Sequence, residues 1–90
     1  ILYEAQGRVD KALPLYLRAL QLHQEVLGPN HPDVARSCNN LGILYLDQGR
    51  LDQAEEMLSR ALHIWTRSLP ADHPHIRMVR SNLQELQEKR

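Results

Sequence analysis

Apolar residues recur along the chain at intervals of three and four positions, which is the spacing of one face of an α-helix. In the clearest stretch, apolar or small residues stand at Leu51, Ala54, Leu58, Ala61, Leu62, Trp65 and Leu69. An earlier stretch has the same spacing at Val9, Ala12, Leu13, Tyr16, Ala19, Leu20 and Leu27. Shorter stretches show it again at Val34, Cys38, Leu41, Leu44 and Tyr45, and at Ile76, Val79, Leu83 and Leu86. The pattern predicts an all-α protein built from amphipathic helices.

Glycine and proline mark where these helices end and begin. Gly49 is suited to the left-handed backbone that ends a helix, and Gly7 stands in the same setting earlier in the chain. Pro32 and Pro74 each follow a histidine and suit the first position of a helix. These signals predict helices near residues 1–6, 9–27, 32–48, 51–69 and 74–88. Pro14 lies inside the second of them, where it removes one backbone hydrogen bond and predicts a small kink.

The chain contains a second copy of part of itself, displaced by 42 residues. Of the 48 overlaid pairs, 17 are identical, whereas chance matching at ordinary composition gives about three. The run Gln6-Gly7-Arg8 reappears as Gln48-Gly49-Arg50, and His31-Pro32 reappears as His73-Pro74. Two helices of about 15–19 residues, joined by short turns, occupy a period of this length. Each repeat is therefore predicted to be a helical hairpin.

Composition narrows the class of protein. The 90 residues include 11 Lys and Arg and 11 Asp and Glu, and this zero formal charge argues against a nucleic-acid partner. Cys38 is the single cysteine, which excludes an internal disulfide. The sequence has no apolar run long enough to predict a membrane span, and its first residues do not have the pattern of a signal peptide. The unpaired thiol and the absence of targeting signals favour a cytoplasmic location.

Catalytic and metal-binding patterns find little support in the sequence. His31 and His73 are copies in one kind of loop, a full repeat apart, and are too distant to share a zinc ion. Cys38 stands on an apolar stripe and is expected to be a small buried residue rather than a nucleophile. The 4 glycines are isolated and form no phosphate-binding loop. The sequence thus predicts no enzyme activity, no cofactor and no metal, and it predicts that Trp65 packs between repeats.

Three short motifs carry a resemblance to a known family. The residues Leu41-Gly42-x-x-Tyr45, then Gly49-x-x-x-x-Ala54, then Ala61-Leu62 resemble the tetratricopeptide repeat signature. The long period with its His-Pro start is similar to the variety found in kinesin light chains and nephrocystin-3. The resemblance implies antiparallel helix hairpins stacked as a right-handed α-solenoid. It divides the chain into a partial first repeat (1–31), a complete second repeat (32–73) and a polar capping helix (74–90).

The same resemblance implies a function, because such repeats bind protein partners along a concave face lined by the first helix of each hairpin. The family pattern, together with helical spacing from the apolar stripe, assigns ten residues to this face: Arg36, Asn39, Asn40, Ile43, Leu46, Asp47, Met78, Ser81, Asn82 and Glu85. Asparagine amides set among apolar groups suit an extended peptide or protein segment. For Asn40, a purely structural role in bonding neighbouring backbone or water is the open alternative.

The start of the chain suggests a second hypothesis. Ile1 aligns with Ile43, so the sequence begins inside the first helix of a hairpin. We therefore expect a piece of a longer array, in which Leu2 and Tyr3 lack the cover of upstream residues. Under this alternative the chain is an architectural or self-associating stretch of a larger signalling protein, and it forms a homo-oligomer through that half-helix. Neither hypothesis involves nucleic acid or a membrane.

Overall fold

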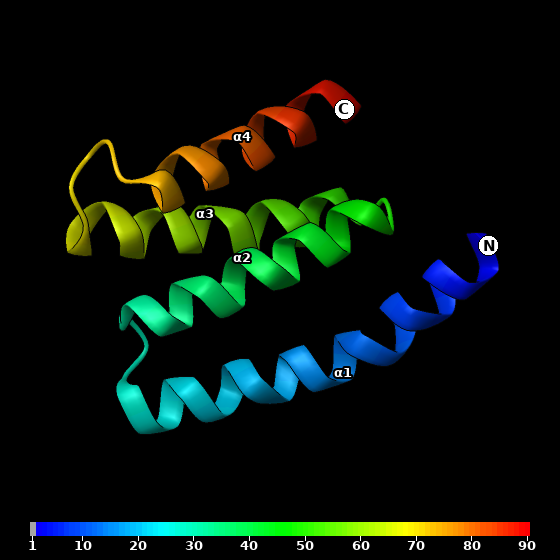
Figure 1. The fold of residues 1–90 in the computed structure, drawn as a ribbon, viewed down its shortest axis with the longest axis horizontal. Helices are drawn as coiled ribbons and strands as arrows, with labels where there is room; N and C mark the ends of the chain where they lie inside the picture. Colours follow the sequence, from blue (N-terminus) through cyan, green and yellow to red (C-terminus); the bar gives the residue numbers. More distant parts are fainter. Residues whose placement is uncertain (1) are drawn as a thin grey trace.

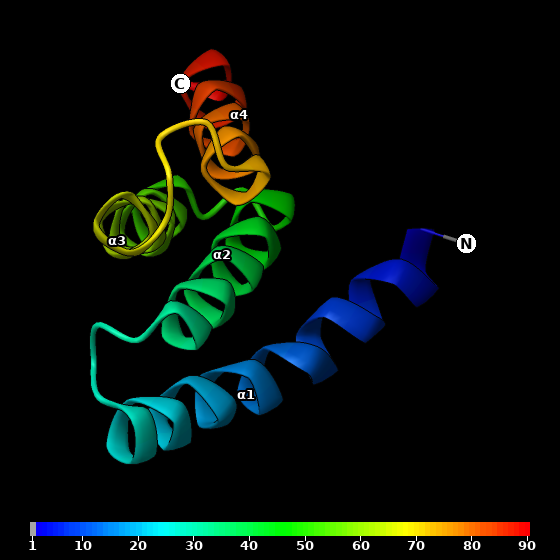
Figure 2. The same cartoon turned by 60° about the vertical axis from the view of Figure 1, so that its left-hand side comes forward.

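The computed structural model describes the backbone of residues 2–90 and the side chains of residues 10–90. This described part contains the helices α1 (Leu2–Leu27), α2 (Pro32–Asp47), α3 (Leu51–Ser68) and α4 (Pro74–Lys89), and it contains no strand. Helix α2 lies between α1 and α3, and α4 packs against α3 and touches α2 (Figures 1 and 2). The predicted all-α architecture of helix hairpins is therefore confirmed. None of the described helices is long and apolar enough to cross a membrane.

The N-terminal quarter differs from the sequence prediction. Separate helices over 1–6 and 9–27 were expected, with a break at Gly7, but α1 is a single helix over Leu2–Leu27. A six-residue arm that folded back would bury little apolar surface, whereas continuing the helix keeps a backbone hydrogen bond at each residue. A glycine inside a helix costs only about 1 kcal/mol, so continuation is the more stable choice. Pro14 also lies within α1 without ending it.

The turn between α2 and α3 shows what an actual break at glycine requires. Gly49 has a positive φ of 76°, its N–H donates to the carbonyl of Leu46 at 3.0 Å, and the next N–H, from Arg50, donates to Tyr45 at 2.8 Å. These paired bonds satisfy the carbonyl groups that the end of a helix leaves without partners. Backbone hydrogen bonds thus close the turn between α2 and α3, and Gly49 has the left-handed conformation that the sequence predicted for the end of a helix.

Helices α2 and α3 approach each other most closely at Gly42. A Cβ atom at this position would lie 2.6 Å from the Leu58 side chain and 3.4 Å from the carbonyl oxygen of Ala54. Glycine is therefore required here by space rather than by backbone conformation. Around this contact lies a core drawn almost entirely from α2, α3 and α4, to which α1 contributes the buried Leu20 and the partly buried Leu13. Over residues 10–27, α1 consequently has the smallest share of buried side chains among the described helices.

Candidate functional site

The face predicted to bind a partner lies on α2 and α4. Eight of its ten predicted residues are at least partly exposed: Arg36, Asn40, Ile43, Asp47, Met78, Ser81, Asn82 and Glu85. The other two, Asn39 and Leu46, were predicted to point outward but are only 2% and 3% exposed. The prediction was wrong for these two because it treated α2 as packed on one side only. In the structure α2 is packed by α1, α3 and α4.

Asn39 forms the polar base of this face. The side-chain amide N–H of Asn82 donates to the amide oxygen of Asn39 at 3.2 Å, which joins α4 to α2 across the repeat boundary. Because the oxygen of Asn39 sits in a nearly dry environment, this hydrogen bond satisfies a group that would otherwise be costly to bury. Helix α4 packs mainly against α3, and the two asparagines add a polar link from α4 to α2.

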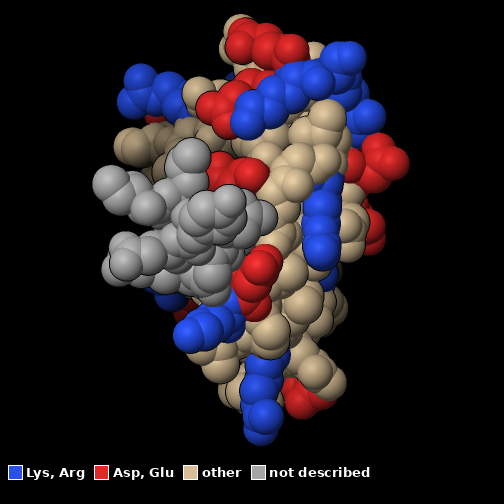
Figure 3. All heavy atoms as spheres, turned by 90° about the vertical axis from the view of Figure 1, so that its right-hand side faces the viewer, with Lys and Arg blue, Asp and Glu red and all other residues tan. Residues whose placement is uncertain are grey.

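Two charged residues of the face, Arg36 and Glu85, form local ion pairs. Arg36 lies 3.8 Å from Asp33, one turn earlier on α2, and Lys89 lies 3.8 Å from Glu85 on α4. Pairs as exposed as these contribute little to stability and exchange readily with other partners. On the end of the molecule shown in Figure 3, acidic and basic side chains are likewise interspersed. The described surface on this end therefore carries charges of both signs rather than a patch of one sign.

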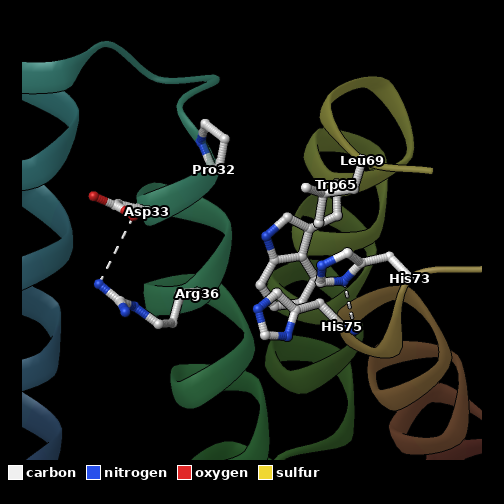
Figure 4. Close-up of a pocket in the computed structure, with 7 residues that line it drawn as sticks. All are labelled: Pro32, Asp33, Arg36, Trp65, Leu69, His73 and His75. Carbon is white, nitrogen blue, oxygen red and sulfur yellow. Dashed lines mark hydrogen bonds and ion pairs between the residues drawn. The ribbon is translucent and has the colours of Figure 1, made fainter.

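A hollow of about 200 Å³ continues the face toward the end of α3. It is lined by Pro32, Asp33, Arg36, Trp65, Leu69, His73 and His75 (Figure 4). The imidazole of His75 stacks on the Trp65 indole with ring centroids 5.0 Å apart. Figure 4 shows the Arg36 guanidinium directed toward Asp33 and away from these rings. The hollow therefore has aromatic walls, while the cation at its edge belongs to the open face of α2.

Two histidines begin α2 and α4. The Nδ1 atom of His31 accepts a hydrogen bond from the backbone N–H of Asp33 at 3.1 Å, and Nδ1 of His73 accepts from the N–H of His75 at 3.0 Å. Each ring thus satisfies a free N–H of the first helical turn, while the proline that follows supplies none. Only a neutral imidazole with its proton on Nε2 can accept at Nδ1. The repeated His-Pro pair is therefore a helix-capping device.

We expect substitution of His73 with alanine to lower the free energy of unfolding by about 1 kcal/mol, because the cap of α4 is lost. His73→Asn keeps a side-chain acceptor and should retain most of the stability. His73 is the cleaner test, since His31 also has a carboxylate oxygen of Asp33 3.9 Å from Nδ1. Urea denaturation at neutral pH measures the effect, with the exposed His63→Ala on α3 as the matched control. Equal stability of His73→Ala and wild type would contradict the capping role.

The cysteine considered as a nucleophile lies in the core. Cys38 is fully buried, as predicted, and burial raises the pKa of its thiol, an effect that the nearby Arg60 charge only partly offsets. A thiol with a raised pKa is a poor nucleophile at neutral pH. Within the described residues no group of three or more His, Cys, Asp or Glu side chains is placed to hold a metal ion. Trp65 is buried between α3 and the start of α4, which agrees with its predicted role in packing.

Comparison with known protein families agrees with the helix hairpins. A family model described as tetratricopeptide repeat matches residues 1–67 and, in a second overlapping match, residues 39–88. The chain therefore belongs to the tetratricopeptide repeat family. Such repeats are non-catalytic units that generally mediate protein–protein interaction. No curated protein sequence matches the chain.

Sequence reasoning missed one polar residue that connects the two repeats. Arg60 on α3 donates to the side-chain oxygen of Gln24 on α1, and also to the backbone carbonyl of Pro29 at 3.3 Å. The guanidinium thus joins the end of α1 and its loop to the second hairpin. The available signal was Arg18, the copy of Arg60 in the first repeat. A charged residue repeated in register on a partly buried helix favours a structural contact over a solvated one.

Proposed function

We propose that the chain binds an extended peptide or protein segment along the exposed residues of α2 and α4. The observation that carries this proposal is the hydrogen bond between Asn39 and Asn82, which links α2 and α4 beneath their exposed residues. A preformed surface binds with less loss of conformational freedom than one that must order on binding. Family membership supports the coarser statement that the partner is a protein.

The chemistry of the face suits a segment with both apolar and backbone contacts. Met78 is an exposed, flexible apolar side chain on α4, and the partly exposed Ile43 stands on α2. Methionine adapts its shape to different apolar partners. The amides of Asn40 and Asn82 carry donors and acceptors that match the N–H and C=O groups of an extended backbone. In this proposal residues 32–73 form the complete repeat, and the helix of residues 74–90 supplies the second wall.

Peptide selection followed by calorimetry tests the proposal. A random twelve-residue peptide library is selected on the wild-type chain, and the affinities of the enriched peptides are measured by isothermal titration. The variant Asn40→Ala is expected to bind about fivefold to tenfold more weakly, because about 1–1.5 kcal/mol of hydrogen bonding to the peptide is lost. Asn82 is left unchanged because its amide also bonds Asn39. Met78→Glu should also bind more weakly, since it places a charge among the apolar contacts.

The control variant is Gln53→Ala/Ser59→Ala, which changes two exposed residues of α3 away from the proposed face. It should bind as the wild type does. Thermal denaturation of each variant confirms that the helices remain folded. Equal affinity of the peptides for wild type, the asparagine variant and Met78→Glu would exclude this face as the binding site.

A further inference from the structure

The hollow between the starts of α2 and α4 holds a hydrogen-bond donor that the fold leaves without a partner. Trp65 is only 2% exposed, yet no hydrogen bond of its indole Nε1–H is found within residues 10–90. The only fully enclosed side-chain nitrogen or oxygen without a partner in this part of the chain is Oε1 of Gln48. The indole N–H is therefore not sealed in the core, and Figure 4 shows its nitrogen on the side of the ring that faces α2.

The first repeat gives an internal comparison for this donor. The copy of Trp65, 42 residues earlier, is His23, and Nδ1 of His23 is hydrogen-bonded to the hydroxyl of Ser37 at 3.0 Å. The copy of Ser37 in α4 is Val79, whose side chain has no polar group. The ring nitrogen is thus paired with the next helix in one repeat, whereas the indole N–H lacks this partner in the other. Because a buried polar group without a partner is costly, an unpaired donor at the edge of a hollow points to an acceptor from outside the chain.

A second donor stands beside the indole. Nδ1 of His73 accepts from the N–H of His75 at 3.0 Å, which requires the proton of the neutral ring to be on Nε2. The capping bond therefore makes the other nitrogen of His73 a donor. The ring of His75 stacks on the indole with centroids 5.0 Å apart and is tilted against the ring of His73 at 4.6 Å (Figure 4). The three rings form one wall, which offers N–H groups and flat apolar surface.

The charged side chains at the hollow are turned away from this wall. Arg36 lies 3.8 Å from Asp33, and Figure 4 shows the guanidinium directed away from the rings. Pro32 and Leu69 supply further apolar surface. An ion that entered the hollow would lose water without meeting an opposite charge, so the site favours a neutral acceptor. Every lining residue lies within residues 32–75, so α1 takes no part in forming the hollow.

We propose that the hollow binds a proline residue of an extended partner segment, with the carbonyl group before the proline accepting the Nε1–H of Trp65. An apolar cavity of about 150 Å³ is enough for a benzene ring, so a hollow of about 200 Å³ admits the smaller ring of proline. Proline brings no N–H that would need a partner against the aromatic rings, and extended proline segments keep their carbonyl groups free. Grooves lined by aromatic residues recognise such segments in other proteins. The inference rests on the proposed function, since Arg36 belongs both to the hollow and to the face of α2 and α4.

The single tryptophan makes the site directly observable. In a nitrogen–proton correlation spectrum of the full chain, the indole N–H of Trp65 gives one signal. Titration with acetyl-alanyl-prolyl-alanine amide should move this signal downfield, because the N–H gains a hydrogen bond, with a dissociation constant on the order of 1 mM. Acetyl-trialanine amide has an N–H in place of the proline ring and should bind about tenfold more weakly.

Two variants test the place of binding. Leu69→Phe puts a larger side chain into the hollow and should weaken binding of the proline peptide about tenfold. Leu22→Phe, at an exposed position on α1 outside the hollow, is the matched control and should leave the affinity unchanged. Thermal denaturation shows whether both variants remain folded. Equal affinity of the proline peptide for wild type and a folded Leu69→Phe would place the binding elsewhere and overturn the proposal.

The comparison of the two peptides on the wild-type chain decides the inference even if Leu69→Phe does not fold. An indole signal that neither peptide moves would overturn it, and so would equal affinity of the two peptides. The proposed function is judged separately, by the peptides selected from the library. A selected peptide that loses affinity on Asn40→Ala but leaves the indole signal unmoved would support the face of α2 and α4 and exclude the hollow.

Discussion

Replacing Trp65 with alanine is expected to lower the free energy of unfolding by about 3–5 kcal/mol. The indole is only 2% exposed, and it fills the space between the end of α3 and the start of α4, where His75 stacks on it at 5.0 Å. Removing it leaves a cavity between α3 and α4. Because a domain of this size is stable by only about 5–15 kcal/mol, the variant should be close to unfolding.

Thermal and urea denaturation measure this change, and two variants on neighbouring residues define its origin. His75→Ala removes the stacking partner of Trp65, together with the contact of its ring with His73, and should cost about 0.5–1.5 kcal/mol. Thr66→Ala, at the exposed position next to Trp65, should be nearly neutral. A loss below about 1 kcal/mol for Trp65→Ala would mean that α4 is not held to α3 by this residue.

The second large effect is expected at Leu58, and the first repeat supplies its comparison. Leu58→Ala should lower the free energy of unfolding by about 2–5 kcal/mol, since this fully buried side chain packs against Gly42 at the closest approach of α2 and α3. Tyr16 is the residue at the same place in the first repeat, and it is 39% exposed. Tyr16→Ala removes a larger side chain, yet it should cost less than about 1 kcal/mol.

The two variants are best compared by urea denaturation under one set of conditions. The prediction concerns their order: the smaller deletion should have the larger effect, because cover by a neighbouring helix and not residue size decides the cost. Equal losses for Leu58→Ala and Tyr16→Ala would show that the corresponding sides of α1 and α3 are equally covered in solution.

The fold followed from the sequence because several independent signals agreed at the same positions. The three-and-four spacing, the glycine at the end of α2 and the prolines at the starts of α2 and α4 all pointed to the same hairpins. At Gly7 the local signal was the same as at Gly49, but the outcome was different. A glycine permits a helix to end, whereas packing on the far side of the turn decides whether it does. Such packing is a tertiary property that local spacing does not contain.

The candidate site was predictable only in part, for a related reason. Spacing along α2 identifies one side that faces α3, but α2 also meets α1 and α4, so Asn39 and Leu46 are covered. The hydrogen bond between Asn39 and Asn82 joins residues 43 positions apart, and the spacing of apolar residues along a helix does not indicate it. Repetition in a sequence predicts similar helices and does not predict similar neighbours.

The buried thiol of Cys38 makes it possible to measure how often the helices around it separate. Because the side chain is fully enclosed and its pKa is raised, a thiol reagent can react only while α2 is separated from its neighbours. The chain has no second cysteine, so every modified molecule records one such excursion. The rate of labelling then measures how often α2 separates from its neighbours under native conditions, without denaturant and without an added reporter group.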